Sequence, residues 1–80
     1  MNNFSIIGNF VKLDSIDENV IYITSTSPLN KNILIPIVCS SNQIFKINEN
    51  DLLGIHGFIE NENNSIKLIA SKIVWLSNKK

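Results

Sequence analysis

Aromatic and polar side chains that alternate with apolar residues are the groups of this chain best suited to chemistry. In the stretch VIYITS, an extended strand places Tyr22 and Thr24 on the face opposite two isoleucines, because successive strand side chains point in opposite directions. The stretch DLLGIHGFIE places His56 and Phe58 opposite a second apolar set in the same way. Aromatic rings on such a face can stack on unpaired bases, which contributes about 1 to 3 kcal/mol per base.

Lysines accompany these strands. Four of the seven basic residues lie in or beside the expected strands, where their ammonium groups can hold phosphates while neighbouring rings stack on bases. The candidate nucleic-acid-binding residues are Lys12, Tyr22, Thr24, Lys31, His56, Phe58, Lys67 and Lys72. Two alternatives stay open: Tyr22 could pack at the edge of the core or in an interface, and Phe58 could pack under a helix or against a second protomer.

Catalytic and metal-binding patterns do not appear in the sequence. The single histidine, His56, has no second histidine, cysteine or paired carboxylate at a recognisable spacing, and the single cysteine, Cys39, has no partner for a disulfide or a C-x-x-C site. A glycine-rich phosphate loop is also missing. We therefore predict no enzyme activity, no catalytic residue, no bound metal and no cofactor.

The remaining large aromatic residues are expected to serve packing. Trp75 lies in the alternating run IVWL, which predicts a place in the core or in a dimer contact. Phe45 follows Ile44 and precedes Ile47, and this spacing predicts that the three side chains seal the bottom of the fold.

Length and charge limit what the chain can do. Eighty residues make one small domain, and seven lysines balance seven acidic residues, so the whole molecule has no long-range attraction for a polyanion. Nucleic-acid binding must therefore depend on local contacts. The N-terminus lacks a basic region followed by an apolar run, and no apolar stretch approaches the roughly 18 residues that span a membrane. With its lone cysteine, the chain is expected to be a soluble cytoplasmic protein with no membrane partner.

The apolar pattern is short-period and rich in β-branched residues, which favours strands. Gly8 predicts a bulge or bend, and Pro36 predicts a strand edge or bulge. Ser40 or Ser41 can cap one or two helical turns within residues 40–50. The expected strands cover residues 4–13, 20–25, 33–39, 51–60 and 66–76.

Three strands, a short helical connection and two further strands are the element order of an OB fold, with an SH3-like barrel as the main alternative. The prediction is an all-β, five-stranded OB-fold barrel with the helical connection between strands 3 and 4. Residues 1–77 form this single domain, and residues 78–80 form a polar C-terminal tail.

Three stretches resemble bacterial single-stranded DNA-binding proteins. MNNFSIIGNFVKL is similar to their first strand, NDLLGIHGFIE to their fourth strand, and KLIASKIVWLS to their last strand. GFI and LIASKI are also similar to primosomal replication protein N, a shortened relative in the same family. The stretches DSIDEN and NENNS depart from the family, because they are short and acidic where members have long basic and aromatic loops. The acidic, Gly/Pro-rich tail that recruits replication partners is absent as well.

The resemblance implies a protein that binds single-stranded DNA, or RNA, or a small replication or recombination accessory subunit with replication proteins as partners. The alternative is an OB-fold module for protein interaction or oligomerisation with little nucleic-acid binding, which the acidic loops and the zero net charge favour. The first strand is apolar on both faces and has an edge available for a second copy, which predicts a homo-oligomer, a dimer or tetramer.

Overall fold

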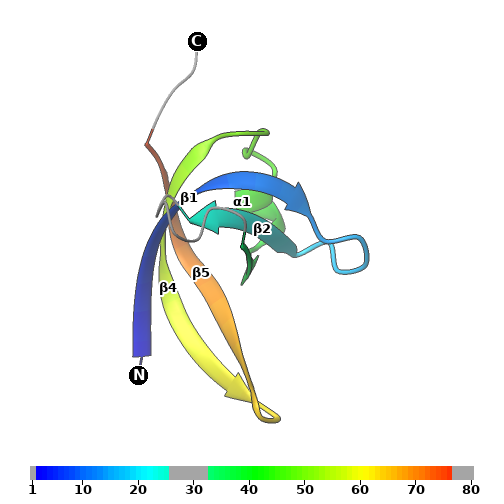
Figure 1. Ribbon diagram of the computed structural model, residues 1–80, viewed down its shortest axis with the longest axis vertical. Helices are drawn as coiled ribbons and strands as arrows, with labels where there is room; N and C mark the ends of the chain where they lie inside the picture. Colours follow the sequence, from blue (N-terminus) through cyan, green and yellow to red (C-terminus); the bar gives the residue numbers. More distant parts are fainter. Residues whose placement is uncertain (1, 26–32, 77–80) are drawn as a thin grey trace.

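The computed structural model describes residues 2–25 and 33–76. Five strands close into a barrel in the order β1-β2-β3-β5-β4 (Figure 1). All neighbouring strands are antiparallel except β3 and β5, which pair in parallel. This arrangement confirms the predicted five-stranded OB-fold barrel. The elements are β1 Asn2–Leu13, β2 Val20–Ser25, β3 Leu34–Val38, α1 Ser41–Ile44, β4 Leu52–Glu62 and β5 Ser65–Trp75.

The core consists of the apolar residues that alternate along the strands. Five side chains have no exposed surface, and Phe10 and Cys39 are nearly as buried. The fully buried residues are Ile21, Ile23, Ile37, Leu53 and Ile55. Because these residues point inward, the residues between them on β2 and β4 point outward, as the sequence pattern predicted.

The hairpin between β4 and β5 is longer than expected. The sequence predicted a polar loop over residues 61–65, but β4 continues to Glu62 and β5 begins at Ser65. Asn63 and Asn64 make the turn with φ angles of 48° and 67°, and asparagine tolerates this left-handed region better than most residues. The two strands therefore extend together as a long arm beside the start of β1 (Figure 1).

The irregularity in β1 lies two residues after the predicted one. Gly8 was expected to mark a bulge or bend, and the register of β1 against β2 shifts between Phe10 and Lys12 instead of at Gly8. Gly8 instead allows close contact with β2, because a Cβ atom there would lie 2.2 Å from the carbonyl oxygen of Thr24. Pro36 lies opposite Tyr22 of β2, while β5 pairs with β3 only at Val38. The proline is therefore in a stretch of β3 that has a paired strand on one side only, which is the predicted edge position.

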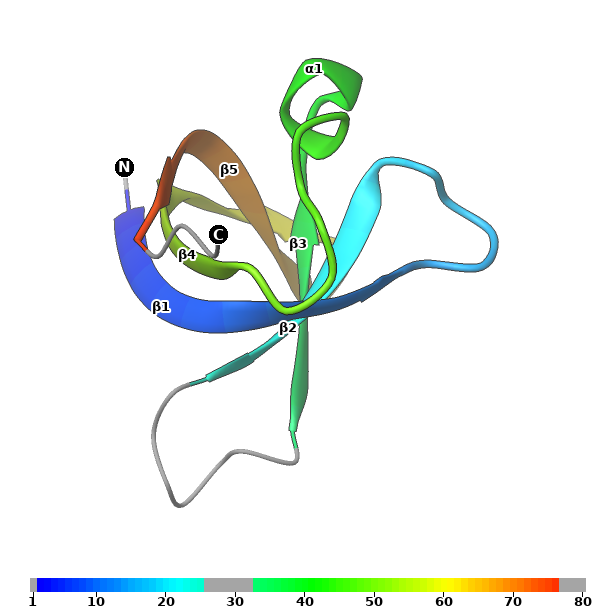
Figure 2. The ribbon, with the colours of Figure 1, turned by 90° about the horizontal axis from the view of Figure 1, so that it is seen from above.

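Helix α1 is a single turn that lies at one end of the barrel, apart from the β4–β5 arm (Figure 2). Ile44 and Ile47 pack against the core, but Phe45 is 85% exposed, so the prediction that Phe45 seals the barrel is wrong. The helix is too short to direct three neighbouring apolar residues inward.

Trp75 packs against the core, as predicted, and its Nε1 donates a hydrogen bond of 3.1 Å to Asp51 Oδ2. Within residues 2–25 and 33–76, no helix has the length and hydrophobicity needed to span a membrane.

Candidate nucleic-acid interface

Outward side chains form two rows across β1, β2 and β3. Lys12 lies opposite Tyr22, which lies opposite Pro36, and Thr24 lies opposite Leu34 in the next row. We call these five residues the strand-two face. Pro36 and Leu34 are exposed, whereas Tyr22 and Thr24 are half-buried. The face therefore offers a shallow apolar surface with one aromatic ring and a lysine at its edge.

Tyr22 is held in place from two sides. Its hydroxyl donates a hydrogen bond of 2.6 Å to Asp14 Oδ1, and the Lys12 ammonium lies 5.7 Å from the centroid of its ring. The hydrogen bond to Asp14 is the main cause that raises the pKa of Tyr22 above its usual value, with a further contribution from desolvation. A ring fixed in this way does not have to be ordered when a base stacks on it.

Asp14 organises the loop between β1 and β2. Its Oδ2 accepts the backbone N–H groups of Ile16 and Asp17 at 3.0 and 2.8 Å, while its Oδ1 accepts the Tyr22 hydroxyl. The Asp17 N–H, followed by the Tyr22 hydroxyl, lowers the pKa of the Asp14 carboxyl. The carboxylate places a negative charge at the hydroxyl end of Tyr22, so a phosphate is favoured at the Lys12 end instead.

A second group of predicted residues lies on the outside of β4 and β5. Ser5, His56 and Lys72 form a row across β1, β4 and β5, and the Ser5 hydroxyl hydrogen-bonds to His56 Nδ1 at 3.1 Å. Phe58 is half-buried two residues further along the same outer side of β4, opposite Ile69. This row combines an imidazole, an ammonium and a hydroxyl, which are all groups that can bind an anion.

Two predicted lysines contribute less to either surface. The Lys67 ammonium lies 2.9 Å from Glu62 Oε1, and this hydrogen bond is the main cause that raises the pKa of Lys67. Glu60 lies directly across from Lys67 in the arm, so two carboxylates surround this one ammonium. Lys31 lies outside the described residues.

The structure thus divides the predicted residues into two groups. Lys12, Tyr22 and Thr24 belong to the strand-two face, whereas His56, Phe58 and Lys72 lie on β4 and β5. The sequence grouped these residues as one candidate site, but β1 separates β2 from β4, so they lie on two surfaces.

Sequence reasoning missed two features of these surfaces. Pro36 and Leu34 line the strand-two face, but their places beside Tyr22 and Thr24 follow from strand register, which the sequence does not state. The link from Asp14 to Tyr22 was also missed. An aspartate that opens a polar turn signals hydrogen bonds to the next backbone N–H groups, so part of this link was detectable.

Metal-binding and nucleophilic groups do not gather in the part of the chain that the structure describes. No group of three or more His, Cys, Asp or Glu residues is placed there to hold a metal ion. Cys39 is buried in the core, and desolvation raises the pKa of its thiol to about 11.

Comparisons with known proteins support the fold. No family model matches the chain, and no curated protein matches its sequence. Among solved structures, the mitochondrial single-stranded DNA-binding protein Rim1 of S. cerevisiae superposes with a TM-score of 0.74 at 15% identity, covering 99% of this chain and 97% of Rim1. A chain of the S. pombe Stn1–Ten1 complex gives 0.69 at 16% identity, covering 98% of this chain. This chain spans only 60% of that second chain. At such identities the chain shares the fold of these proteins.

Proposed function

We propose that this protein binds single-stranded nucleic acid, with DNA as the first candidate, through the strand-two face. The observation that carries the proposal is the row Lys12, Tyr22 and Pro36 across three strands of the barrel. An aromatic ring with an ammonium beside it is the minimal arrangement for stacking a base while holding its phosphate. The protein acts as a binding protein or accessory subunit in replication or recombination, and not as a catalyst.

The similar solved structures support this proposal, because one is described as a single-stranded DNA-binding protein. OB folds also bind proteins and oligosaccharides, so the fold alone does not decide the ligand. The chemistry of the face favours nucleotides. Tyr22 is pre-oriented by Asp14, and the path next to Lys12 is open to a phosphate because the Lys12 side chain is exposed.

Fluorescence anisotropy with a labelled oligo-dT tests the proposal. Tyr22→Ala should weaken binding by about 5- to 150-fold, the effect of losing one base stack. Tyr22→Phe is the matched control, since it keeps the ring and removes only the hydroxyl that bonds to Asp14. Its affinity should stay within about threefold of that of the wild type. Absence of binding by the wild type at micromolar protein and low salt would overturn the proposal.

The salt dependence gives an independent measure of the number of phosphate contacts. Each neutralised phosphate of a single strand contributes about 0.7 to the slope of log K against log salt. Lys12 forms no ion pair among the described residues, whereas Lys67 is bound to Glu62. As the one lysine of the strand-two face, Lys12 predicts a contribution of about −0.7 per protomer to the slope. Lys12→Gln should reduce the slope by about 0.7, and Lys67→Gln should leave it nearly unchanged.

A homo-oligomer is the second part of the proposal. Residues 2–7 of β1 pair with β4, and β2 joins β1 only from Gly8 onward, so the start of β1 has one strand neighbour within the described chain. Ile7, 48% exposed, lies beside this edge. Edge strands of this kind pair readily with a second copy. If nucleic-acid binding is weak, such an assembly surface becomes the main function of the module.

Sedimentation of the wild type and of Ile7→Glu tests the oligomer. The substitution should shift the protein toward the monomer, because it places a charge beside the proposed strand pair. Ile66→Glu is the matched control, since Ile66 is also exposed but lies near the tip of the arm. A wild type that stays monomeric at high concentration would contradict the assembly.

A further inference from the structure

Two adjoining cavities lie between the end of β1 and helix α1. The first has a volume of about 400 Å³ and is walled by Val11, Leu13, Ile44 and Ile47 among others. The second has a volume of about 330 Å³ and is lined by Leu13, Ile44 and Phe45 among others. Leu13 and Ile44 line both cavities. The two cavities are therefore neighbours, and we call them together the helix groove.

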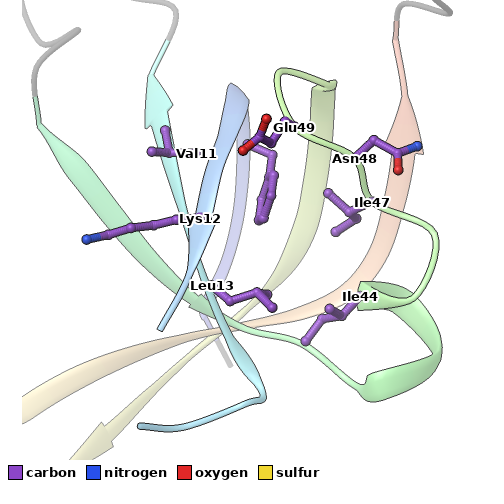
Figure 3. A pocket seen from close by; sticks show the side chains of 8 residues that line it. Val11, Lys12, Leu13, Ile44, Ile47, Asn48 and Glu49 are labelled. Carbon is purple, nitrogen blue, oxygen red and sulfur yellow. The ribbon is translucent and has the colours of Figure 1, made fainter. Parts of the chain in front are cut away.

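The helix groove is apolar and open to solvent. Leu13 is 45% exposed and Phe45 is 85% exposed, although both belong to residue types that are usually buried. In Figure 3 the side chains of Leu13, Ile44 and Ile47 point toward a common space. An occupant that covers these side chains gains about 25 cal/mol for each Å² of apolar surface removed from water.

Both walls of the groove are fixed by their own hydrogen bonds. Ser40 caps α1, because its hydroxyl accepts the Gln43 N–H at 3.3 Å and Gln43 Oε1 accepts the Ser40 N–H at 2.8 Å. The opposite wall is continuous with the loop that Asp14 holds. Because neither wall has to be ordered on binding, more of the contact energy remains as affinity.

The charged side chains that line the helix groove are mainly acidic. Glu49 lines the first cavity and Glu18 lines the second. The only basic residue in the lining is Lys12, but its ammonium lies over the Tyr22 ring, and in Figure 3 its side chain points away from Ile44 and Ile47. An apolar floor with two carboxylates at its sides fits apolar side chains accompanied by positive charges. A nucleic-acid backbone would instead be repelled.

A second copy of this chain offers a poor match for the groove. Outside the groove, Ile66 is one of the most exposed apolar residues in the described part, at 64%. Its neighbour Lys67 is bound to Glu62, and Glu60 lies opposite, so the surface around Ile66 has two carboxylates for one ammonium. Two acidic surfaces disfavour each other.

We propose that the helix groove binds a basic, amphipathic peptide segment of another protein. Leucine-like side chains of this segment fill the two cavities, and its lysines or arginines lie near Glu18 and Glu49. The site shares only Lys12 with the strand-two face, so a partner segment and a nucleic-acid strand use different surfaces of the barrel. This inference does not depend on the proposed nucleic-acid binding.

Anisotropy with a synthetic peptide tests the proposal on the intact protein. The probe is a fluorescein-labelled peptide of about twelve residues, three helical turns, with leucine on one face and lysine on the other. A matched probe carries glutamate in place of lysine. The lysine peptide should bind with micromolar affinity and the glutamate peptide at least about tenfold more weakly. Failure of the lysine peptide to bind, or equal binding of both, would overturn the proposal.

Variants locate the binding surface. Phe45→Ser should weaken the lysine peptide about tenfold, as removal of a central aromatic contact does, and Glu49→Gln should weaken it up to about fivefold. Phe45 is exposed, so its replacement leaves the core intact. Ile66→Ser and Glu60→Gln are the matched controls and should change nothing. An equal loss of peptide affinity in the control variants would show nonspecific binding and overturn the proposed site. Light scattering that shows a dimer lost only in Phe45→Ser would assign the groove to a second copy instead.

Discussion

Replacement of Gly57 by alanine should destabilise the barrel, whereas the same change at Gly54 in the same strand should not. A Cβ atom at Gly57 would lie 1.9 Å from the Ile69 carbonyl oxygen and 2.9 Å from the Phe4 ring. At Gly54 the nearest atom is Leu76 Cδ1, at 3.4 Å, which belongs to a flexible side chain. The same glycine-to-alanine substitution therefore meets a backbone atom at Gly57 and only a side chain at Gly54.

The magnitude follows from two opposing contributions. No described glycine has a positive φ angle, so alanine restricts the unfolded chain at both sites and gains about 0.4 to 1 kcal/mol of stability. At Gly57 the carbonyl oxygen of Ile69 must move away by about 1.5 Å before ordinary van der Waals contact is restored. Overpacking typically costs about 1 to 3 kcal/mol, and a collision with backbone belongs at the upper end. The net loss at Gly57 is about 2 kcal/mol, which lowers the Tm of a domain of this size by about 8 to 16 °C.

Urea unfolding followed by fluorescence measures the difference directly. Trp75 is the only tryptophan, and it packs against the core, so its emission reports the closed barrel. Gly54→Ala should match or slightly exceed the wild-type free energy of unfolding. Unchanged m-values would show that both variants unfold from the same state. A Gly57→Ala protein as stable as Gly54→Ala would refute the contact between β4 and β5 from which the prediction is made.

Three further outcomes are expected. Because its hydrogen bonds lower the pKa of folded Asp14 below 3.8, this carboxylate stabilises the fold above that pH and ceases to do so as the pH falls through the folded value. Asp14→Asn should therefore lose less stability than the wild type in urea titrations between about pH 4 and pH 2, and equal losses would contradict the role of Asp14. Cys39, with its pKa raised to about 11, should resist a thiol reagent at neutral pH until urea unfolds the chain, and rapid labelling of the native protein would show that it is accessible. Trp75→Phe should cost about 1 to 3 kcal/mol by circular dichroism, because Asp51 loses its 3.1 Å donor, and an unchanged stability would mean that this bond contributes nothing.

Much of the fold follows from side-chain periodicity. Alternation on β2 and β4 predicted which residues are buried, and Ile21, Ile23, Leu53 and Ile55 have no exposed surface. The order of three strands, a helical turn and two strands predicted the closed barrel. The length of the β4–β5 arm was not predictable from polarity, because the polar residues of the arm occupy exposed strand positions. Two consecutive asparagines were the only local signal for so tight a turn.

The candidate site was less predictable, because it depends on register and on pairs distant in sequence. The position of Lys12 beside Tyr22 requires the register shift after Phe10, without which a different side chain would face the ring. The division of the lysines between two surfaces follows from β1 lying between β2 and β4. Exposure of Phe45 depends on a helix of one turn, and an apolar pattern three residues long cannot fix the length of a helix.

A net charge of zero hides the separation of charge that gives this barrel two different surfaces. The Asp14 carboxylate accepts hydrogen bonds from two backbone N–H groups and the Tyr22 hydroxyl. At the edge of the strand-two face near Lys12, the ammonium group is therefore the main charge. At the helix groove the relation is reversed, because Lys12 turns toward Tyr22 and leaves Glu18 and Glu49 as the charged lining. The ammonium group of Lys12 therefore makes the potential at the strand-two face more positive, and it leaves the helix groove with a more negative potential. Since salt screens charges over about 8 Å at physiological ionic strength, these local charges, and not the balanced total, set the electrostatic potential at each surface.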